Sequence, residues 1–140
     1  MLFSKRLRYF FLHLTCSLLV GLALLALVFL VWYPAPLASA EGVTTIFLML
    51  LAIDVIVGPL LSLLVYKEGK KTLKMDLSII VFVQVLAMSY GVYAIAQSRP
   101  AWIVQVGWLF EVVPANAVDT GDQKQAQAAY KNNGWLQPQW

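Results

Sequence analysis

The residue with the clearest potential for chemistry is Asp54, in the middle of the apolar run "LMLLAIDVIVGPLLSLLVYK" (48–67). If this run crosses a membrane as a helix, Asp54 lies roughly 18 Å from either surface. A carboxyl group at that depth costs roughly 2.5–3.5 kcal/mol on insertion scales, so such residues usually face other protein or a water-filled path. Asp54 therefore predicts either a polar contact between helices or a proton or cation site.

Small and polar residues share the predicted helix face of Asp54. Gly58 and Ser62 follow at intervals of four residues, which puts all three on one side of a helix. Gly58 and Ser62 form a small-xxx-small pair, which lets another helix approach closely. Pro59 removes one backbone hydrogen bond and predicts a kink beside this face.

The third apolar run, which contains Gln84, should return antiparallel to the second. In such a hairpin Ser89 and Tyr90 lie at the depth of Asp54, and Gln84 lies opposite Pro59. No lysine or arginine is available at this depth in any predicted span. We therefore expect a hydrogen bond to Asp54 within the chain, not an ion pair.

Two interpretations of these faces stay open. Gln84, Ala87 and Gly91 form a second small and polar face, and Ser17 with Gly21 offers a third. The faces could simply hold the three helices of the chain together. Alternatively, one face stays available for a helix from another protein. The binding residues would then be Asp54, Gly58, Pro59, Ser62, Gln84, Tyr90 and Gly91.

Other reactive side chains are few. The one histidine, His13, is expected near the cytoplasmic membrane surface, and the one cysteine, Cys16, is expected to be buried. These residues and the scattered acids lack metal-ligand spacing, and no glycine-rich phosphate loop is present. We therefore expect no enzymatic activity from this chain alone, no metal ion and no cofactor. The alternative function for Asp54 is in a small proton- or cation-linked channel or transporter subunit.

The composition indicates a membrane protein. Hydrophobic residues make up 61% of the 140 residues and charged residues 12%, whereas soluble domains are about half apolar and about a quarter charged. Residues 10–33, 43–66 and 77–96 reach or approach the ~20 residues that cross a bilayer. The prediction is an all-α membrane protein with three transmembrane helices.

Basic residues predict the orientation of these spans. The positive-inside rule places the basic N-terminus (1–9) and the basic loop 67–76 in the cytoplasm. The loop 34–42, which has no basic residue, and the C-terminal tail 97–140 are then periplasmic. Because the net charge of +3 is distributed in this way, we expect contact with membrane lipids and no binding of nucleic acid. The topology determinants are Lys5, Arg6, Arg8, Lys67, Lys70, Lys71 and Lys74.

The short periplasmic tail carries two predicted elements. The stretch "WIVQVGWLFEVV" (102–113) partly alternates, as a strand or β-hairpin does, with Gly107 as a turn or bulge. The stretch "GDQKQAQAAYKNNG" predicts a short helix. Its cap would be Asp119 or Thr120, and Asn133-Gly134 would stop it.

A cleaved signal peptide is the alternative interpretation of residues 1–40, because "ASA" (38–40) looks like a cleavage site. Against it, the apolar run is about 24 residues long, whereas signal peptide cores have about 7–15. The second and third spans keep their orientation in either case.

Several motifs in and around the second and third spans form a distinctive combination. They are Asp-x-x-x-Gly-Pro-Leu-Leu at 54–61, Gly-Lys-x-x-Leu-Lys-x-Asp-Leu at 69–77 and Gln-x-x-x-x-x-Tyr-Gly at 84–91. "VWYPAPL" precedes them and "FEVVPANAVD" follows. With these motifs the chain resembles the type IV pilin accessory protein family (TfpX/TfpZ type) over about residues 8–119.

The resemblance implies a multi-pass protein of the bacterial inner membrane that stabilises a cognate type IV pilin, like a chaperone, and supports pilus assembly. It implies no cofactor. The polar and small face would hold the pilin's transmembrane helix, and the tail from Trp102 onward could contact the pilin head. Family members usually carry a longer periplasmic region, so we expect a shortened one here. The sequence leaves open which pilin is bound and whether the chain forms homo-oligomers.

Overall fold

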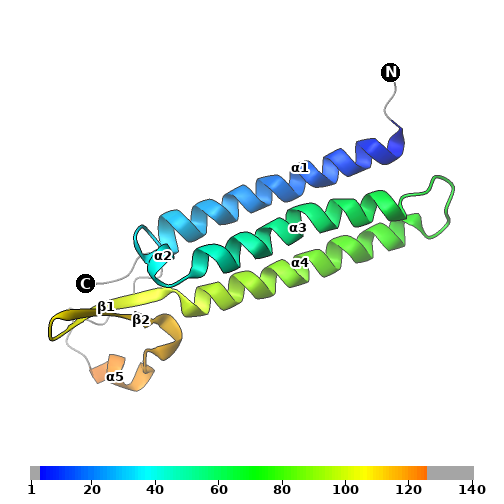
Figure 1. The fold of residues 1–140 in the computed structure, drawn as a ribbon. Helices are drawn as coiled ribbons and strands as arrows, with labels where there is room; N and C mark the ends of the chain where they lie inside the picture. The colour runs from blue at the N-terminus through cyan, green and yellow to red at the C-terminus, as the bar shows by residue number, and fades with distance from the viewer. Residues whose placement is uncertain (1–3, 126–140) are drawn as a thin grey trace. The chain divides into compact units, whose positions relative to one another are not determined.

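Three long apolar helices dominate the computed structural model, which describes residues 4–125 (Figure 1). They are α1 (Lys5–Ala26), α3 (Val43–Val65) and α4 (Leu73–Ser98). A π-helical segment, Leu27–Trp32, continues α1. Each of the three is long and apolar enough to cross a membrane, which confirms the predicted helical class for the described part of the chain.

The long helices expose apolar side chains and bury polar ones. Leu64 is 72% exposed on α3, whereas Ser62, two residues earlier, is 0% exposed. Ser17 is buried on α1. A soluble bundle has the opposite pattern, so these helices are built for lipid as their surroundings. The described part of the chain is thus that of a multi-pass membrane protein.

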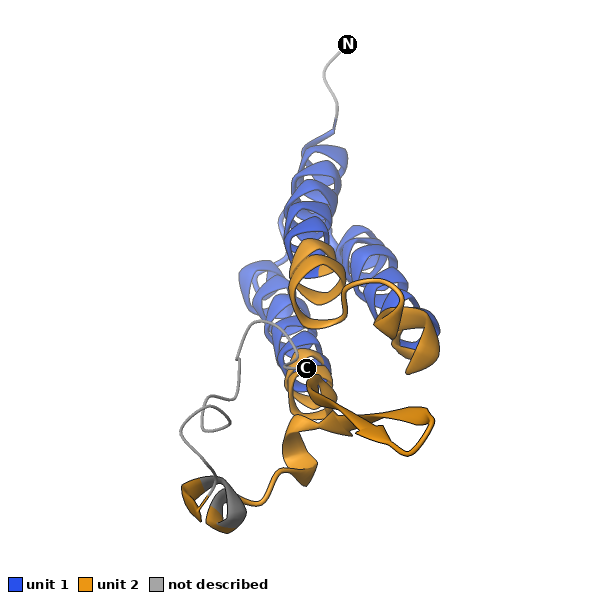
Figure 2. Cartoon of the chain, turned by 90° about the vertical axis from the view of Figure 1, so that its left-hand side faces the viewer, with its two compact units in different colours: residues 1–24, 44–91 blue, residues 25–43, 92–140 orange. Residues whose placement is uncertain are grey.

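The chain divides into two compact units (Figure 2). Unit 1 comprises residues 1–24 and 44–91, and it contains the first part of α1 with most of α3 and α4. Within unit 1 these three helices lie side by side. Unit 2 comprises residues 25–43 and 92–140.

Glycines bring the helices of unit 1 together. A Cβ atom on Gly21 of α1 would lie 2.9 Å from Cδ1 of Leu51 on α3. A Cβ atom on Gly91 of α4 would collide with the side chain of Leu50 on α3. Apolar surface alone gives helices little reason to associate in lipid, so such close approach is a main source of their packing energy.

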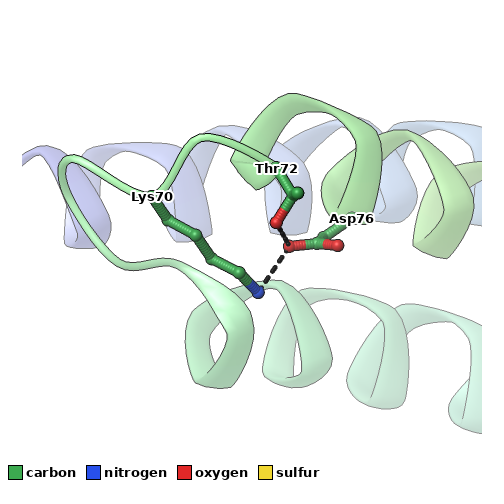
Figure 3. A network of polar contacts seen from close by, with 3 residues as sticks. All are labelled: Lys70, Thr72 and Asp76. Carbon is green, nitrogen blue, oxygen red and sulfur yellow. Dashed lines mark hydrogen bonds and ion pairs between the residues drawn. The ribbon is translucent and has the colours of Figure 1, made fainter.

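Two of the predicted topology determinants, Arg6 and Lys70, make polar contacts at the basic end of unit 1. Arg6 Nε donates to the carbonyl oxygen of Leu63 at 2.7 Å, which satisfies one of the free carbonyls in the last turn of α3. In the loop before α4, Lys70 Nζ lies 2.6 Å from Asp76 Oδ2, and Thr72 Oγ1 donates to the same oxygen (Figure 3). A carboxylate in the first turn also complements the positive end of α4.

Unit 2 contains the C-terminal hairpin. Strands β1 (Pro100–Val106) and β2 (Leu109–Pro114) are antiparallel, and Val106 pairs with Leu109 next to the turn. Gly107 in the turn has φ 65°, a left-handed conformation that favours glycine. The β-hairpin predicted from the alternating sequence is therefore confirmed, with Gly107 in its turn.

A buried tyrosine connects two segments of unit 2 that are distant in sequence. Tyr33 is almost fully buried, and its hydroxyl donates to the carbonyl oxygen of Ile95 at 3.3 Å. It also lies 3.3 Å from Ser98 Oγ. The short helix α2 (Leu37–Ala40) follows Tyr33 in the chain.

After the hairpin come the 3-10 turn η2 (Ala115–Ala117) and the helix α5 (Thr120–Gln125). The carboxylate of Asp119 accepts a hydrogen bond from the backbone N–H of Gly121 at 2.6 Å, as a helix-capping residue does. The predicted stop at Asn133-Gly134 lies outside the described residues.

One prediction about α1 is wrong. Cys16 was expected to be buried, but its side chain is exposed. The reason is geometric: Ser17 and Gly21 occupy the face of α1 that packs on the other helices, and the neighbouring residue points outward.

Candidate functional site

A polar network inside unit 1 joins all three long helices, and Gln84 of α4 is its centre. The Gln84 amide nitrogen Nε2 donates to Ser17 Oγ of α1 at 3.0 Å. The same nitrogen lies 3.1 Å from both the carbonyl oxygen and carboxylate Oδ2 of Asp54 on α3. Two amide hydrogens thus serve three acceptors, so two of the acceptors share one hydrogen.

The other side of the Gln84 amide faces His13. His13 Nε2 lies 3.1 Å from Gln84 Oε1, and His13 Nδ1 lies 2.8 Å from Ser62 Oγ. An amide oxygen only accepts, so with this amide orientation the histidine proton sits on Nε2. In the neutral ring Nδ1 then accepts the hydroxyl hydrogen of Ser62. We call His13, Ser17, Asp54, Ser62 and Gln84 the polar network.

Gly58 creates the space for this network. A Cβ atom at position 58 would collide with the Gln84 amide, so any other residue there would displace the centre of the network. Pro59, the next residue, is also fully buried. Pro59 lies inside α3, where it removes a backbone hydrogen bond without ending the helix.

Asp54 is the member of the network that remains partly accessible. Its side chain is half-buried, and Oδ2 is held by Gln84. Among residues 4–125, nothing donates a hydrogen bond to the other carboxylate oxygen, Oδ1. A carboxylate oxygen in surroundings of low polarity gains from any donor that reaches it. Asp54 can therefore accept a hydrogen bond from a further group while it keeps its contact with Gln84.

The structure unites some of the sequence-predicted residues and separates others. Gln84 lies across from Gly58, one residue from the predicted Pro59. Its long side chain reaches the preceding turn of α3, so Gln84, and not Ser89 or Tyr90, contacts Asp54. Tyr90 is 75% exposed, and Ser89 is exposed as well.

Two further residues of the predicted faces lie apart from the network. Gly91 packs against Leu50 of α3, where it serves helix contact. Ala87 is exposed on α4. The face of Asp54, Gly58 and Ser62 is thus turned toward the chain's own helices, with Asp54 still partly accessible.

His13 is the residue that sequence reasoning missed. It was expected at the membrane surface, yet it joins Ser62 to Gln84. The sequence spacing could have identified it. His13, Ser17 and Gly21 lie four residues apart and therefore form one stripe of α1. The stripe from Asp54 to Ser62 on α3 has the same spacing.

Hydrogen bonding between helices is the chemistry that this arrangement offers. No group of three or more His, Cys, Asp or Glu side chains in the described range is arranged to hold a metal ion. His13 and Asp54 are both linked to Gln84, whose amide does not titrate. The network therefore joins two titratable groups through a neutral one.

Comparison with known proteins gives consistent matches. A family model described as "Fimbrial assembly protein FimB" matches residues 2–42. The "Fimbrial assembly protein, serogroup E1" of Dichelobacter nodosus is 36% identical over 112 residues, or 79% of this chain and 42% of that protein. The "Fimbrial assembly protein, serogroups C1 and C2" of the same organism is 35% identical over 112 residues, or 79% of this chain and 82% of that protein.

The two relatives differ in how far the match extends. This chain spans less than half of the serogroup E1 protein but most of the serogroups C1 and C2 protein. No solved structure matches the chain significantly. The matches agree with the resemblance to type IV pilin accessory proteins. The chain belongs to the FimB family of fimbrial assembly proteins.

Proposed function

We propose that this protein acts in pilus assembly as an inner-membrane accessory protein that stabilises a cognate type IV pilin. The observation that carries the proposal is the 35% identity to a fimbrial assembly protein over 82% of that relative. The proposed function is assembly, not catalysis, and it needs no cofactor. The three helices that can cross a membrane suit a protein that meets pilin before it leaves the membrane.

In the proposed topology the N-terminus and the α3–α4 loop are cytoplasmic. Seven of the ten lysines and arginines lie in or next to these two segments, and the positive-inside rule favours that orientation. Lys70 is paired with Asp76, but acidic residues contribute little to the rule, so the argument stands on the basic residues. The hairpin β1–β2 is then periplasmic.

Asp54 is the proposed contact for the transmembrane helix of the pilin. Its Oδ2 is held by Gln84, and Oδ1 is available to a donor from outside the chain. Helices in lipid associate through close packing and polar contacts, and an interhelical hydrogen bond in model peptides is worth about 1–2 kcal/mol. A hydroxyl, amide or ammonium group on the pilin helix would satisfy Asp54.

In this proposal the rest of the polar network keeps Asp54 in place. Gly58, Pro59 and Ser62 are buried within the chain, so they support Gln84 and do not contact the pilin directly. Tyr90 and Gly91 are the other predicted binding residues, and Tyr90 exposes a large aromatic surface on α4. We propose that Tyr90 packs against the bound helix.

The tip of the hairpin is the proposed contact for the pilin head. Trp108 is 88% exposed and Phe110 71% exposed, and Leu109 between them is also exposed. Aromatic side chains are frequent anchors of protein interfaces. We expect Trp108→Ala to weaken pilin capture without changing the helical bundle.

The test of the intramembrane contact is recovery of the cognate pilin with tagged wild-type protein and with Asp54→Asn. The asparagine oxygen can still accept from Gln84, but an NH2 group replaces the second oxygen. The bundle should therefore keep its stability, and pilin recovery should fall at least about fivefold, the effect of one interhelical hydrogen bond. Asp76→Asn, which removes the carboxylate in the first turn of α4 outside the polar network, is the matched control.

Two results would distinguish a failure of the proposed function from a failure of the proposed Asp54 contact. Normal pilin levels and normal piliation in a deletion strain would contradict the proposed function itself. Equal pilin recovery with wild type and Asp54→Asn would remove only the Asp54 contact, and recovery through the Trp108 tip could then be measured separately.

A proton- or cation-linked channel subunit is the alternative function, and one observation favours it. His13 joins Asp54 through Gln84, so a second titratable group lies in the same network. Proton flux into vesicles containing the purified protein tests this function. Flux that is lost in both Asp54→Asn and His13→Gln would support it, and no flux above empty vesicles would exclude it.

A further inference from the structure

A groove on the outside of unit 1 is separate from the polar network. Its volume is about 600 Å³, and it lies between Tyr9 of α1 and one stripe of α4. The α4 stripe consists of Lys74, Leu77, Ser78, Val81, Phe82 and Val85. These positions recur at intervals of three and four residues, so they form a single face of the helix.

The dimensions of the groove match one leaflet of a bilayer. From Lys74 to Val85, α4 rises roughly 16 Å. The hydrocarbon core of a bilayer is about 30 Å thick, so one leaflet measures about 15 Å. The groove therefore runs from the basic end of the bundle to near the midplane.

The chemistry of the groove changes along its length. Leu77, Val81 and Val85 make the deeper part apolar, and the ammonium of Lys74 stands at the outer end. In the described part of the chain Lys70 is paired with Asp76, whereas Lys74 has no acidic partner. An unpaired ammonium above an apolar channel suits a ligand with an anionic head and a hydrocarbon tail.

The wall formed by Tyr9 is held in place by other aromatic rings. Its ring centroid lies 5.8 Å from that of Tyr66 and 6.3 Å from that of His13, the latter edge-on. Aromatic contacts at these centroid distances are favourable. The groove is therefore a formed feature of unit 1 and does not depend on one mobile side chain.

We propose that this groove binds one anionic phospholipid, with the head group at Lys74 and an acyl chain along Leu77, Val81 and Val85. A transmembrane helix is a poorer occupant, because a helix is about 10–12 Å across and the groove holds only about 600 Å³ along its length. An acyl chain is much thinner. The proposal is independent of the pilin-binding role.

The test is native mass spectrometry of the purified full chain, titrated with phosphatidylglycerol or with phosphatidylcholine of the same acyl chains. Wild type should bind phosphatidylglycerol at least about fivefold more tightly, the factor that one lysine near an anionic lipid gives. Lys74→Gln should lose that preference. Lys71→Gln removes a charge from the loop just before α4 but not from the groove, so it should keep the preference.

A second pair of variants tests the apolar part. Ser78→Trp and Val81→Trp fill the groove at exposed positions, so the fold should tolerate them. Both should weaken binding of the two lipids by about fivefold or more. The proposal would be overturned if Lys74→Gln and Lys71→Gln changed lipid binding equally, or if wild type showed no preference for phosphatidylglycerol. Unchanged lipid binding in both tryptophan variants would overturn it as well.

Discussion

Replacing Gln84 with leucine tests whether the polar network holds the three helices together. The amide of Gln84 contacts Ser17 on α1, Asp54 on α3 and His13 on α1. Leucine is of similar size, so the substitution removes these hydrogen bonds without leaving a large cavity. We expect the folded bundle to be less stable.

The magnitude follows from the number of hydrogen bonds. Gln84 has two amide hydrogens and one carbonyl oxygen, so at most three hydrogen bonds are lost at one time. At the ~0.6 kcal/mol average for membrane proteins the loss is about 2 kcal/mol, and at the ~1.7 kcal/mol maximum it is about 5 kcal/mol. We expect a value near the lower figure, because three of the contacts share one nitrogen, Nε2, which carries only two hydrogens.

The assay is reversible unfolding of the purified protein in mixed micelles with increasing SDS, followed by circular dichroism. The matched control is Ser89→Leu on the same helix, where the serine is exposed and makes no side-chain hydrogen bond in the described part of the chain. The control should stay within about 0.5 kcal/mol of wild type, as surface substitutions do.

A double-mutant cycle with Ser17→Ala makes the result specific to the contact between α1 and α4. If Gln84 and Ser17 interact as the 3.0 Å distance indicates, the double mutant should lose less stability than the two single mutants together. The reasoning would be refuted if Gln84→Leu had the same free energy of unfolding as the Ser89→Leu control. It would also be refuted if the stability losses of Gln84→Leu and Ser17→Ala were strictly additive in the double mutant.

Three further predictions concern single residues. Gly58→Ala should lower the free energy of unfolding by about 1–3 kcal/mol in the same titration, because its Cβ would collide with Gln84; wild-type stability would contradict this contact. Gly107→Ala should loosen the hairpin by roughly 1 kcal/mol, because residue 107 has φ 65°; unchanged hydrogen exchange of the β1 and β2 amides would contradict it. Lys70→Gln should leave bundle stability unchanged, because its ion pair with Asp76 is on the surface; a clear loss in the titration would show that the pair is structural.

Much of the fold was predictable, because the bilayer sets the length of a spanning helix and side chains alternate between the two faces of a β-sheet. About 20 apolar residues can only form a spanning helix, which identifies α1, α3 and α4. Alternation around Gly107 indicated the hairpin. The π-helical segment Leu27–Trp32 was not predictable, because its residues are as apolar as the α-helix before it.

For the candidate site, the sequence predicted which residues share a helix face but not which side chains are in contact. Intervals of four residues placed Asp54, Gly58 and Ser62 together, and matching depths placed Gln84 near Pro59. Depth alone says nothing of side-chain reach or of helix rotation. Gln84 therefore contacts Asp54 one turn away, while Tyr90, predicted at the same depth, is exposed.

The most direct test of the central claim is photo-crosslinking in cells that make the cognate pilin. A photoreactive amino acid is placed at Ile53 or Val57, exposed residues one position before and three positions after Asp54 on α3. It is placed at Phe82 in the proposed lipid groove as the comparison. The account predicts a pilin adduct from position 53 or 57 and none from position 82. Absence of pilin adducts from both α3 positions, in cells where pilin accumulates normally, would contradict it.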